Sequence, residues 1–208
     1  MKSKSPLLII FVTVFVDLVG FGIIIPLSPY LAKHFGASGL QIGLLMSVYS
    51  LAQFIFSPLW GRLSDVYGRR PILLMSLLGS TLAHLGFAFA SDLWMLFVAR
   101  TIAGLFGANI SAASAYIADV TDSKSRSKSM GIIGAAFGIG FILGPAIGGF
   151  LSEWGLQLGT QPPFGIGFSA LGASLICFLN FLFACFRLPE SLPKERRNLA
   201  KKKVGRLH

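Results

Sequence analysis

The sequence predicts an all-α membrane protein with six transmembrane helices and with both termini in the cytoplasm. Its 208 residues are 54% hydrophobic and only 12% charged, which is more apolar than ordinary soluble domains. Six stretches each supply the run of about 20 apolar residues that crosses ~30 Å of hydrocarbon. Apart from Lys33 and Arg100, every Lys and Arg falls near a terminus or in alternate loops. This asymmetry places those loops in the cytoplasm, so the net charge of +10 needs no nucleic acid to explain it.

The six predicted spans are joined by short connections, so successive helices are expected to be antiparallel neighbours. We expect one transmembrane domain over residues 1–187 and a basic cytoplasmic tail over residues 188–208. Within the spans the sequence offers no nucleophile–base set and no cluster of metal ligands, so we expect neither an enzyme nor a cofactor or metal site. The spans cover residues 6–30, 40–60, 71–90, 93–118, 129–151 and 164–186.

The first span carries an acid, Asp17, eleven residues in from Pro6. At 1.5 Å per residue it lies about 16 Å deep, near the middle of the bilayer. An ionised carboxylate there is costly unless it is protonated, paired or hydrated, which are the properties of a proton carrier. The alternative is a structural acid that bonds to a neighbouring helix.

The second and third spans carry fewer polar groups. Gln53 can hydrogen-bond a substrate or can bridge two helices, and bridging is the favoured reading. His84 is the one ionisable group of the third span and has no acid at helical spacing. We therefore expect a packed, neutral histidine.

The connection between these two spans, residues 61–70, is short and polar. Gly61 and Gly68 permit positive φ and close approach, and Pro71 suits the first turn of the next helix. The charged residues of this turn lie against helix ends, where they can clamp neighbouring helices. The alternative is a solvated basic turn that only follows the positive-inside rule. The charged residues in question are Asp65, Arg69 and Arg70.

The fourth span places Arg100 about 10 Å below the outer surface, counted at the helical rise from residue 93. A guanidinium inside a membrane requires water or a carboxylate, and Asp17 is the available buried partner. Such a pair acts either as a proton switch or as a permanent ion pair that fixes packing. The same span delivers Asp119 to the cytoplasmic side, where Arg69 is also expected.

The fifth span is rich in glycine at four-residue spacing, which forms a groove for close helix packing in lipid. Its proline removes one backbone hydrogen bond and favours a bend. The sixth span is aromatic, and its Cys177 and Cys185 are expected to be hydrophobic packing residues. The glycines and proline of interest in the fifth span are Gly140, Gly144, Pro145, Gly148 and Gly149.

The pattern G-x-x-x-D-x-x-G-R-R-x-x-L over residues 61–73 resembles the loop between helices 2 and 3 of the major facilitator superfamily. The resemblance implies a cytoplasmic latch in which Arg69 bonds to Asp119 and Asp65 caps a helix of a second half. Gly61, Gly68 and Arg70 belong to the same gating motif.

Three further patterns are similar to drug efflux members of that superfamily. The order D-x-x-G-x-G-x-x-x-P-x-x-P from Asp17 resembles helix 1 of tetracycline and multidrug efflux proteins, which implies a role in proton coupling. The surroundings of Arg100 resemble the helix 4 motif to which proton transfer is assigned. The run G-x-x-x-G-P-x-x-G-G over residues 140–149 is similar to a motif associated with antiporters.

The resemblance covers the first half of a twelve-helix architecture, that is, one six-helix half made of two inverted three-helix repeats. It implies a bacterial inner-membrane antiporter half that exchanges protons for small amphipathic drugs such as tetracycline, with Gln53 and Asn109 facing the substrate. We expect it to be inactive without a second six-helix half or a second copy of itself. The alternative is a non-transporting six-helix subunit or truncated remnant that associates with another membrane protein.

Overall fold

The computed structural model describes residues 5–107 and 109–198, and all the regular structure in these ranges is helical. Six runs of helix in the described ranges are long and apolar enough to cross a membrane, so the six predicted spans are confirmed. Two of them are composite, because α4 and α5 share the fourth span and a short 3-10 helix, η1, precedes α7. The elements are α1 Ser5–His34, α2 Gly39–Tyr67, α3 Arg69–Ala88, α4 Leu93–Phe106, α5 Asn109–Val120, α6 Arg126–Leu158, η1 Gly165–Gly167 and α7 Phe168–Arg187.

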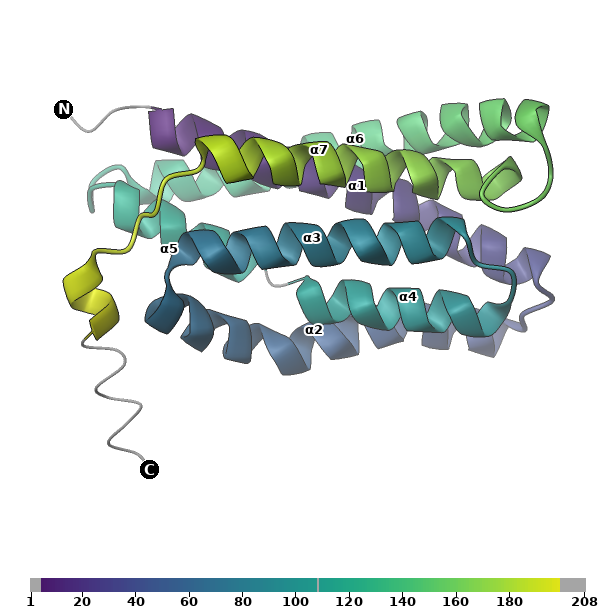
Figure 1. Ribbon diagram of the computed structural model, residues 1–208, viewed down its shortest axis with the longest axis horizontal. Helices are drawn as coiled ribbons and strands as arrows, with labels where there is room; N and C mark the ends of the chain where they lie inside the picture. The colour runs from purple at the N-terminus through teal and green to yellow at the C-terminus, as the bar shows by residue number, and fades with distance from the viewer. Residues whose placement is uncertain (1–4, 108, 199–208) are drawn as a thin grey trace.

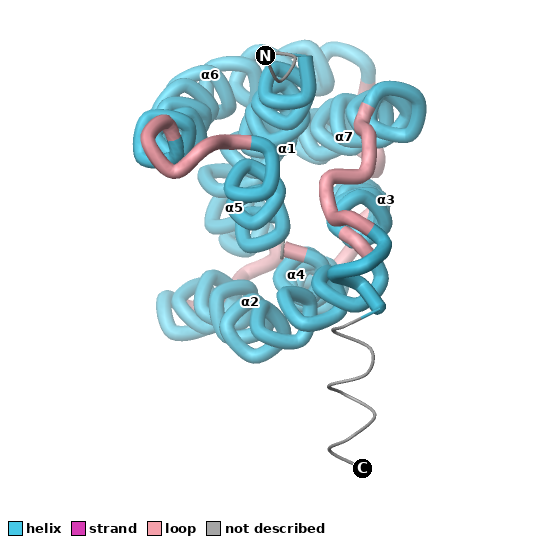
Figure 2. The backbone as a smooth tube through the Cα atoms, turned by 90° about the vertical axis from the view of Figure 1, so that its left-hand side faces the viewer, coloured by secondary structure: helices cyan, strands magenta, loops and turns pink. Residues whose placement is uncertain are grey.

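The helices form one elongated bundle (Figure 1). α1 packs mainly against α6 and α7, α3 packs against α7 and α4, and α2 packs against α4. Seen end-on, α6 lies at one edge of the bundle and α2 at the opposite edge (Figure 2). α2 and α6 are also the least buried of the six described spans. The bundle therefore exposes two long apolar helix faces and buries most of α1 and α3.

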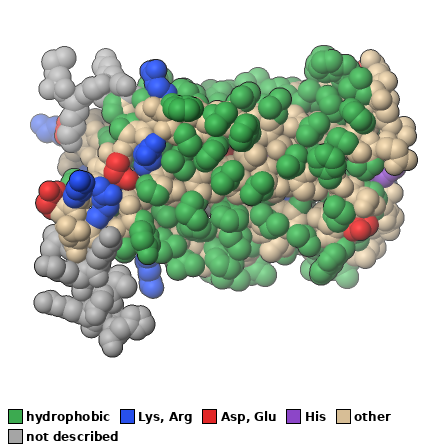
Figure 3. All heavy atoms as spheres, viewed as in Figure 1, with side chains coloured by type: hydrophobic (Ala, Val, Ile, Leu, Met, Phe, Trp, Pro, Cys, Tyr) green, Lys and Arg blue, Asp and Glu red, His purple; other side chains and the backbone are tan. Residues whose placement is uncertain are grey.

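Charged side chains gather at one end of the bundle, while the middle of the face seen in Figure 3 is mainly hydrophobic. The charged end holds the α2–α3 turn, the α5–α6 connection and the end of α7 (Figure 1). By the positive-inside rule this is the cytoplasmic end. The arrangement agrees with the predicted topology.

The expected polar loop between the second and third spans is almost entirely helical. α2 continues to Tyr67 and α3 begins at Arg69, so Gly68 alone makes the turn, with φ of 112°. Gly61 lies inside α2 in open space, so the expected need for a glycine there was wrong. Hydropathy falls where a helix leaves the membrane, but the helix itself can go on into water. The predicted span therefore ended too early.

The fourth span was predicted to be one helix, but α4 ends at Phe106 and α5 begins at Asn109. The last carbonyl groups of α4 accept hydrogen bonds from side chains of neighbouring helices. Trp60 Nε1 donates to the carbonyl of Leu105 at 2.6 Å, and Ser76 Oγ donates to that of Phe106. Such donors replace the backbone partners that carbonyls lack where a helix ends. The interruption is thus stabilised from α2 and α3.

The predicted glycine groove of the fifth span is confirmed in part: Gly140, Gly144 and Gly148 form the packing surface between α6 and α1, whereas a Cβ added at Gly134 or Gly138 meets nothing within 4 Å. A Cβ atom added at Gly144 would lie 2.6 Å from the Cα of Gly22, and one at Gly140 would lie 3.0 Å from Leu18 Cβ. Gly148 faces Ile23 in the same way. By contrast, an added Cβ at Gly149 meets nothing within 4 Å, so this glycine plays no part in that contact.

Replacing Gly144 by alanine is expected to lower the free energy of unfolding by about 2 kcal/mol, because overpacking against backbone forces the helices apart. Gly138→Ala is the matched control on α6, since an added Cβ there meets nothing within 4 Å. Its effect is expected to be neutral or slightly stabilising. The measurement is unfolding in mixed detergent micelles, and equal effects of the two changes would contradict the packing assignment.

Candidate functional site

Asp17 lies on α1 and is 6% exposed. It lines a cavity of about 130 Å³ to which all the helices from α1 to α6 contribute. The cavity thus brings together polar groups from several spans that are distant in sequence. Its polar side chains are those of Asp17, Tyr49, Gln53, Ser80 and His84.

Arg100 on α4 is 2% exposed. Its guanidinium lies over the Tyr49 ring at 5.1 Å from the centroid, and Nη2 donates to Met46 Sδ at 3.3 Å. The Tyr49 ring also lines the Asp17 cavity, so it lies between the surroundings of the guanidinium and those of the carboxylate. The direct pairing of Arg100 with Asp17 stays a prediction.

His84 is packed, as expected, and it lies in the wall of the same cavity as Asp17. Its Nδ1 atom is 3.5 Å from Cys177 Sγ on α7, and both residues are buried. Helical spacing within the third span gave no signal for this cavity, because Asp17 lies on α1.

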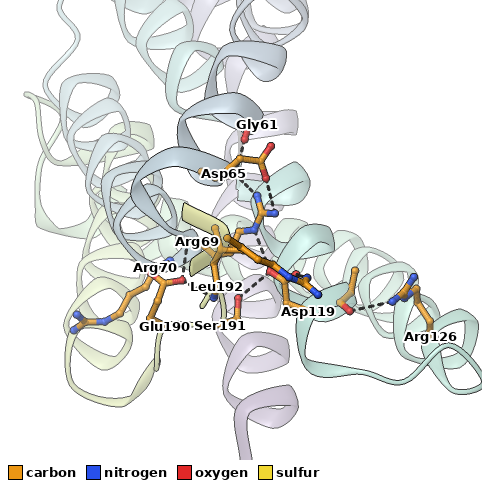
Figure 4. Close-up of polar contacts among 12 residues, drawn as sticks. Gly61, Asp65, Arg69, Arg70, Asp119, Arg126, Glu190, Ser191 and Leu192 are labelled. Atoms are coloured by element: carbon orange, nitrogen blue, oxygen red, sulfur yellow. Dashed lines mark hydrogen bonds and ion pairs between the residues drawn. The ribbon is translucent and has the colours of Figure 1, made fainter. Parts of the chain in front are cut away.

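At the cytoplasmic end, Arg69 bonds to both acids of the expected latch, Asp65 and Asp119 (Figure 4). Its Nη2 atom is 2.6 Å from Asp65 Oδ1, and its Nε atom donates to Asp119 Oδ2 at 3.2 Å. The guanidinium also donates to Ser64 Oγ at 2.5 Å. Arg69 is only 8% exposed, so these bonds hold a largely buried charge between α2 and α5. We call this set the Arg69 cluster.

Arg70, the other arginine of the motif, lies outside the Arg69 cluster. Its Nη2 atom donates to the carbonyl of Cys185 at 2.6 Å, which ties the start of α3 to the end of α7.

Glu190 is a residue of this region that sequence reasoning missed. Its carboxylate accepts hydrogen bonds from the backbone N–H groups of Arg69 at 2.9 Å and Arg70 at 3.3 Å, and so caps the N-terminus of α3. Gly68 has a φ of 112°, which favours glycine, and a Cβ there would also push the Glu190 carboxylate away from its place, since it would lie 2.2 Å from Oε2. The sequence contained one signal for this cap: Gly68, at the N-cap position of α3, has no side chain that could accept these hydrogen bonds, so the acceptor had to come from elsewhere.

The segment that follows α7 lies against the bundle and does not leave it at once. Leu188 and Leu192 are buried, and Ser191 Oγ donates to Asp119 Oδ2 at 3.3 Å. These contacts connect the beginning of the expected tail to the Arg69 cluster (Figure 4). The boundary at residue 187 stays a prediction, and residues 199–208 of the tail lie outside the described residues.

Glu190→Ala is expected to lower the free energy of unfolding by about 1–2 kcal/mol, because two N–H groups at the start of α3 lose their acceptor. Glu195→Ala is the matched control, since Glu195 is exposed and lies in the same segment. Unfolding in mixed micelles measures both changes. A loss no larger for Glu190→Ala than for the control would contradict the capping role.

Gln53 on α2 bridges helices, in agreement with the favoured reading. Its Nε2 atom donates to the carbonyl of Gly107 at 2.7 Å and lies 3.3 Å from Tyr49 Oη. It also lines a second, open groove of about 700 Å³ between α2 and α5. The side chain of Asn109, the other predicted substrate residue, lies outside the described residues. In the part of the chain that the structure describes, no group of three or more His, Cys, Asp or Glu residues is placed to hold a metal.

Residues 10–207 match the family model described as Major Facilitator Superfamily. The chain is 40% identical to the class C tetracycline resistance protein of Escherichia coli over 95% of its own length and 48% of that protein. It is 34% identical to multidrug resistance protein 2 of Bacillus subtilis (strain 168), over 95% of this chain and 47% of that protein. The chain thus spans about half the length of the curated relatives it matches.

Among solved structures, the human organic anion transporter MFSD10 (TETRAN) superposes with a TM-score of 0.80 and 27% identity, over 93% of this chain and 49% of that chain. A peptide transporter, POT, in complex with sulfate superposes with a TM-score of 0.76 over 98% of this chain and 44% of that chain. Its identity of 17% supports the fold alone.

Proposed function

The chain belongs to the major facilitator superfamily, and from this premise we propose that it works as the N-terminal six-helix half of a proton-coupled drug antiporter. The substrates proposed are small amphipathic compounds such as tetracycline, because relatives named for tetracycline resistance match nearly the whole chain. The chain spans about half of each such relative. We therefore propose that transport requires a second six-helix half.

The observation that carries the proposal is the burial of Asp17 in the wall of a cavity that also holds polar side chains from α2 and α3. Burial of a carboxyl group in a membrane span costs much more free energy when the group is charged than when it is protonated. Its protonation therefore depends on whether water reaches it. The Arg100 guanidinium supplies a fixed positive charge over the Tyr49 ring, which lines the same cavity. Protonation of Asp17 therefore changes the electrostatic balance of the site, which is the step that couples proton movement to a conformational change.

The Arg69 cluster supports the gating part of the proposal. Its bonds join α2, α3 and α5 at the cytoplasmic end, and Asp65 is 55% exposed and so remains open to another partner. A reversible gate needs at least one contact of modest strength, and the pair of Arg69 with the partly exposed Asp65 supplies it. We propose that this cluster holds the cytoplasmic ends together in one state and releases them in the other.

The exposed faces of α2 and α6 are proposed as the surfaces that meet the second half. Both helices lie at edges of the bundle (Figure 2) and are the least buried described spans. Transporters of this architecture bind substrate at the interface between two halves. The open groove between α2 and α5 would then form part of the substrate pathway.

The test is drug efflux from cells that express this chain alone, a second six-helix half from a tetracycline efflux relative alone, or both together. Energy-dependent efflux by the pair but by neither half alone is the expected result. Full efflux by this chain alone would contradict the need for a second half. Stable insertion of both halves without any efflux would contradict the transport proposal and favour a non-transporting subunit.

A further inference from the structure

The side of the bundle formed by α3 and α7 carries an apolar surface of its own. The two helices pack against each other and form one side of the bundle when it is seen end-on (Figure 2). On each of them, exposed large hydrophobic side chains recur at helical spacing and so form a stripe. We call the two stripes together the α3–α7 face. Its side chains include Met75, Leu78 and Leu82 on α3 and Leu175, Leu179 and Phe186 on α7.

Lipid is the expected cover of the α3–α7 face. The faces proposed to meet a second half belong to α2 and α6, which lie at the two edges of the bundle (Figure 2). Contacts between transmembrane helices favour small residues that let the backbones approach. The side chains named for the α3–α7 face are all large, which suits contact with acyl chains.

Two arginines lie at the cytoplasmic margin of this face. Arg70 belongs to the first turn of α3, and exposed Arg187 is the last residue of α7. Phe186, which is 84% exposed, directly precedes Arg187 and ends the apolar stripe of α7. Figure 3, which shows the side on which α3 and α7 lie in front in Figure 1, has hydrophobic side chains over its middle and Lys and Arg at one end. Positive charge thus lies where acyl chains meet lipid headgroups.

The Arg70 guanidinium is held in place by the end of α7. Pro189 has no N–H group, so the carbonyl of Cys185, four residues earlier, lacks its helical donor. Arg70 Nη2 donates to this carbonyl at 2.6 Å, whereas Arg70 Nε has no hydrogen-bond partner among the described residues. The guanidinium is therefore fixed at the end of α7 and keeps donor capacity for a second acceptor.

Within residues 5–107 and 109–198, no carboxylate forms a salt bridge with either of these two arginines. The salt bridges in these ranges are made by Arg69 and Arg196. The Glu190 carboxylate accepts from backbone N–H groups at the start of α3, and the Arg70 side chain points away from the Arg69 cluster (Figure 4). An anion from the surroundings can therefore serve as the counter-charge.

We propose that the α3–α7 face binds an anionic phospholipid of the cytoplasmic leaflet, with the phosphate at Arg70 and Arg187 and an acyl chain along the stripe that ends at Phe186. Guanidinium groups are strong donors to phosphate oxygens. A lipid with a net negative charge binds in preference to a zwitterionic one, because a choline group would bring a positive charge towards the two arginines. The inference does not depend on the proposed transport function.

The test measures how phosphatidylglycerol and phosphatidylcholine compete for the complete chain in detergent micelles. Native mass spectrometry separates the two complexes by mass, and a titration gives the apparent dissociation constant of each lipid. Phosphatidylglycerol is expected to bind about tenfold more tightly than phosphatidylcholine, since two basic groups near the membrane surface act on it.

Arg187→Gln removes one charge and none of the described hydrogen bonds, so the dissociation constant of phosphatidylglycerol is expected to rise about fivefold, the factor for one basic group. Arg70→Gln is expected to act in the same direction, and Arg187→Lys is expected to keep most of the affinity. Arg62→Gln is the matched control, since Arg62 is exposed near the cytoplasmic end of α2. Its affinity is expected to stay unchanged.

Weaker binding of phosphatidylglycerol in Arg187→Gln and Arg70→Gln, with no loss in Arg62→Gln, supports the lipid site. Equal losses in all three variants overturn it, because diffuse surface charge then explains the attraction. Equal affinity of the unaltered chain for the two lipids also overturns it. Displacement of phosphatidylglycerol by inorganic phosphate at millimolar concentration overturns the assignment to a lipid, because a free anion then occupies the two arginines.

Discussion

Replacing Asp17 by asparagine is expected to reduce drug efflux by the paired halves to the background of cells without the transporter. Asparagine keeps the size of the side chain but can neither release nor accept a proton at accessible pH. Asp17 is buried in the wall of the cavity. Because an asparagine side chain cannot gain or lose charge, the step that couples proton movement to transport is lost in Asp17→Asn. Efflux of a fluorescent tetracycline from energised cells measures the effect.

The matched control is Ser28→Ala on the same helix. Ser28 is fully buried, and its hydroxyl donates only to the carbonyl of Ile24 in its own helix turn. Efflux is expected to persist in this variant at equal expression. Retained efflux in Asp17→Asn would remove Asp17 from the coupling mechanism and would leave a structural acid as the explanation of its burial.

Replacing Arg69 by alanine is expected to lower the free energy of unfolding of the chain by about 3 kcal/mol. The change leaves the largely buried Asp119 carboxylate without its closest guanidinium, and breaking a buried pair on one side carries a cost of this size. Asp65 and Ser64 lose a partner at the same time. Unfolding in mixed detergent micelles measures the difference.

Arg62→Gln serves as the matched control, because Arg62 is exposed and lies near the same end of α2. Its effect is expected to stay below ~1 kcal/mol, as for surface charges in general. Equal losses for the two variants would mean that the Arg69 cluster contributes no more to the free energy of unfolding than an ordinary surface charge. That result would contradict its role as a cytoplasmic clamp.

The parts of the fold that sequence patterns predicted are those set by local composition. Apolar runs predicted the six spans, and four-residue glycine spacing predicted the surface on which α6 meets α1 at Gly144. The proximity of Arg69 and Asp119 came from a motif and from topology, since both lie at the cytoplasmic end. The roles assigned to these residues remain predictions.

The parts that sequence patterns missed depend on contacts between distant helices. The interruption after Phe106 lies inside a continuous apolar run, and it is stabilised by Trp60 and Ser76 from other helices. The contact of the Arg100 guanidinium with the face of the Tyr49 ring was also missed, because it joins two helices that are distant in sequence. Glu190 reaches the start of α3 from the far end of the chain. Neither spacing nor hydropathy carries such information.

Proton coupling through Asp17 is tested most directly in sealed liposomes that contain this chain together with a second six-helix half and a pH-sensitive dye in the lumen. An imposed gradient of tetracycline is expected to drive protons in the opposite direction, and the lumenal pH is expected to stay constant in Asp17→Asn. Tetracycline movement without any pH change, or a pH change that persists in Asp17→Asn, would contradict the proposal.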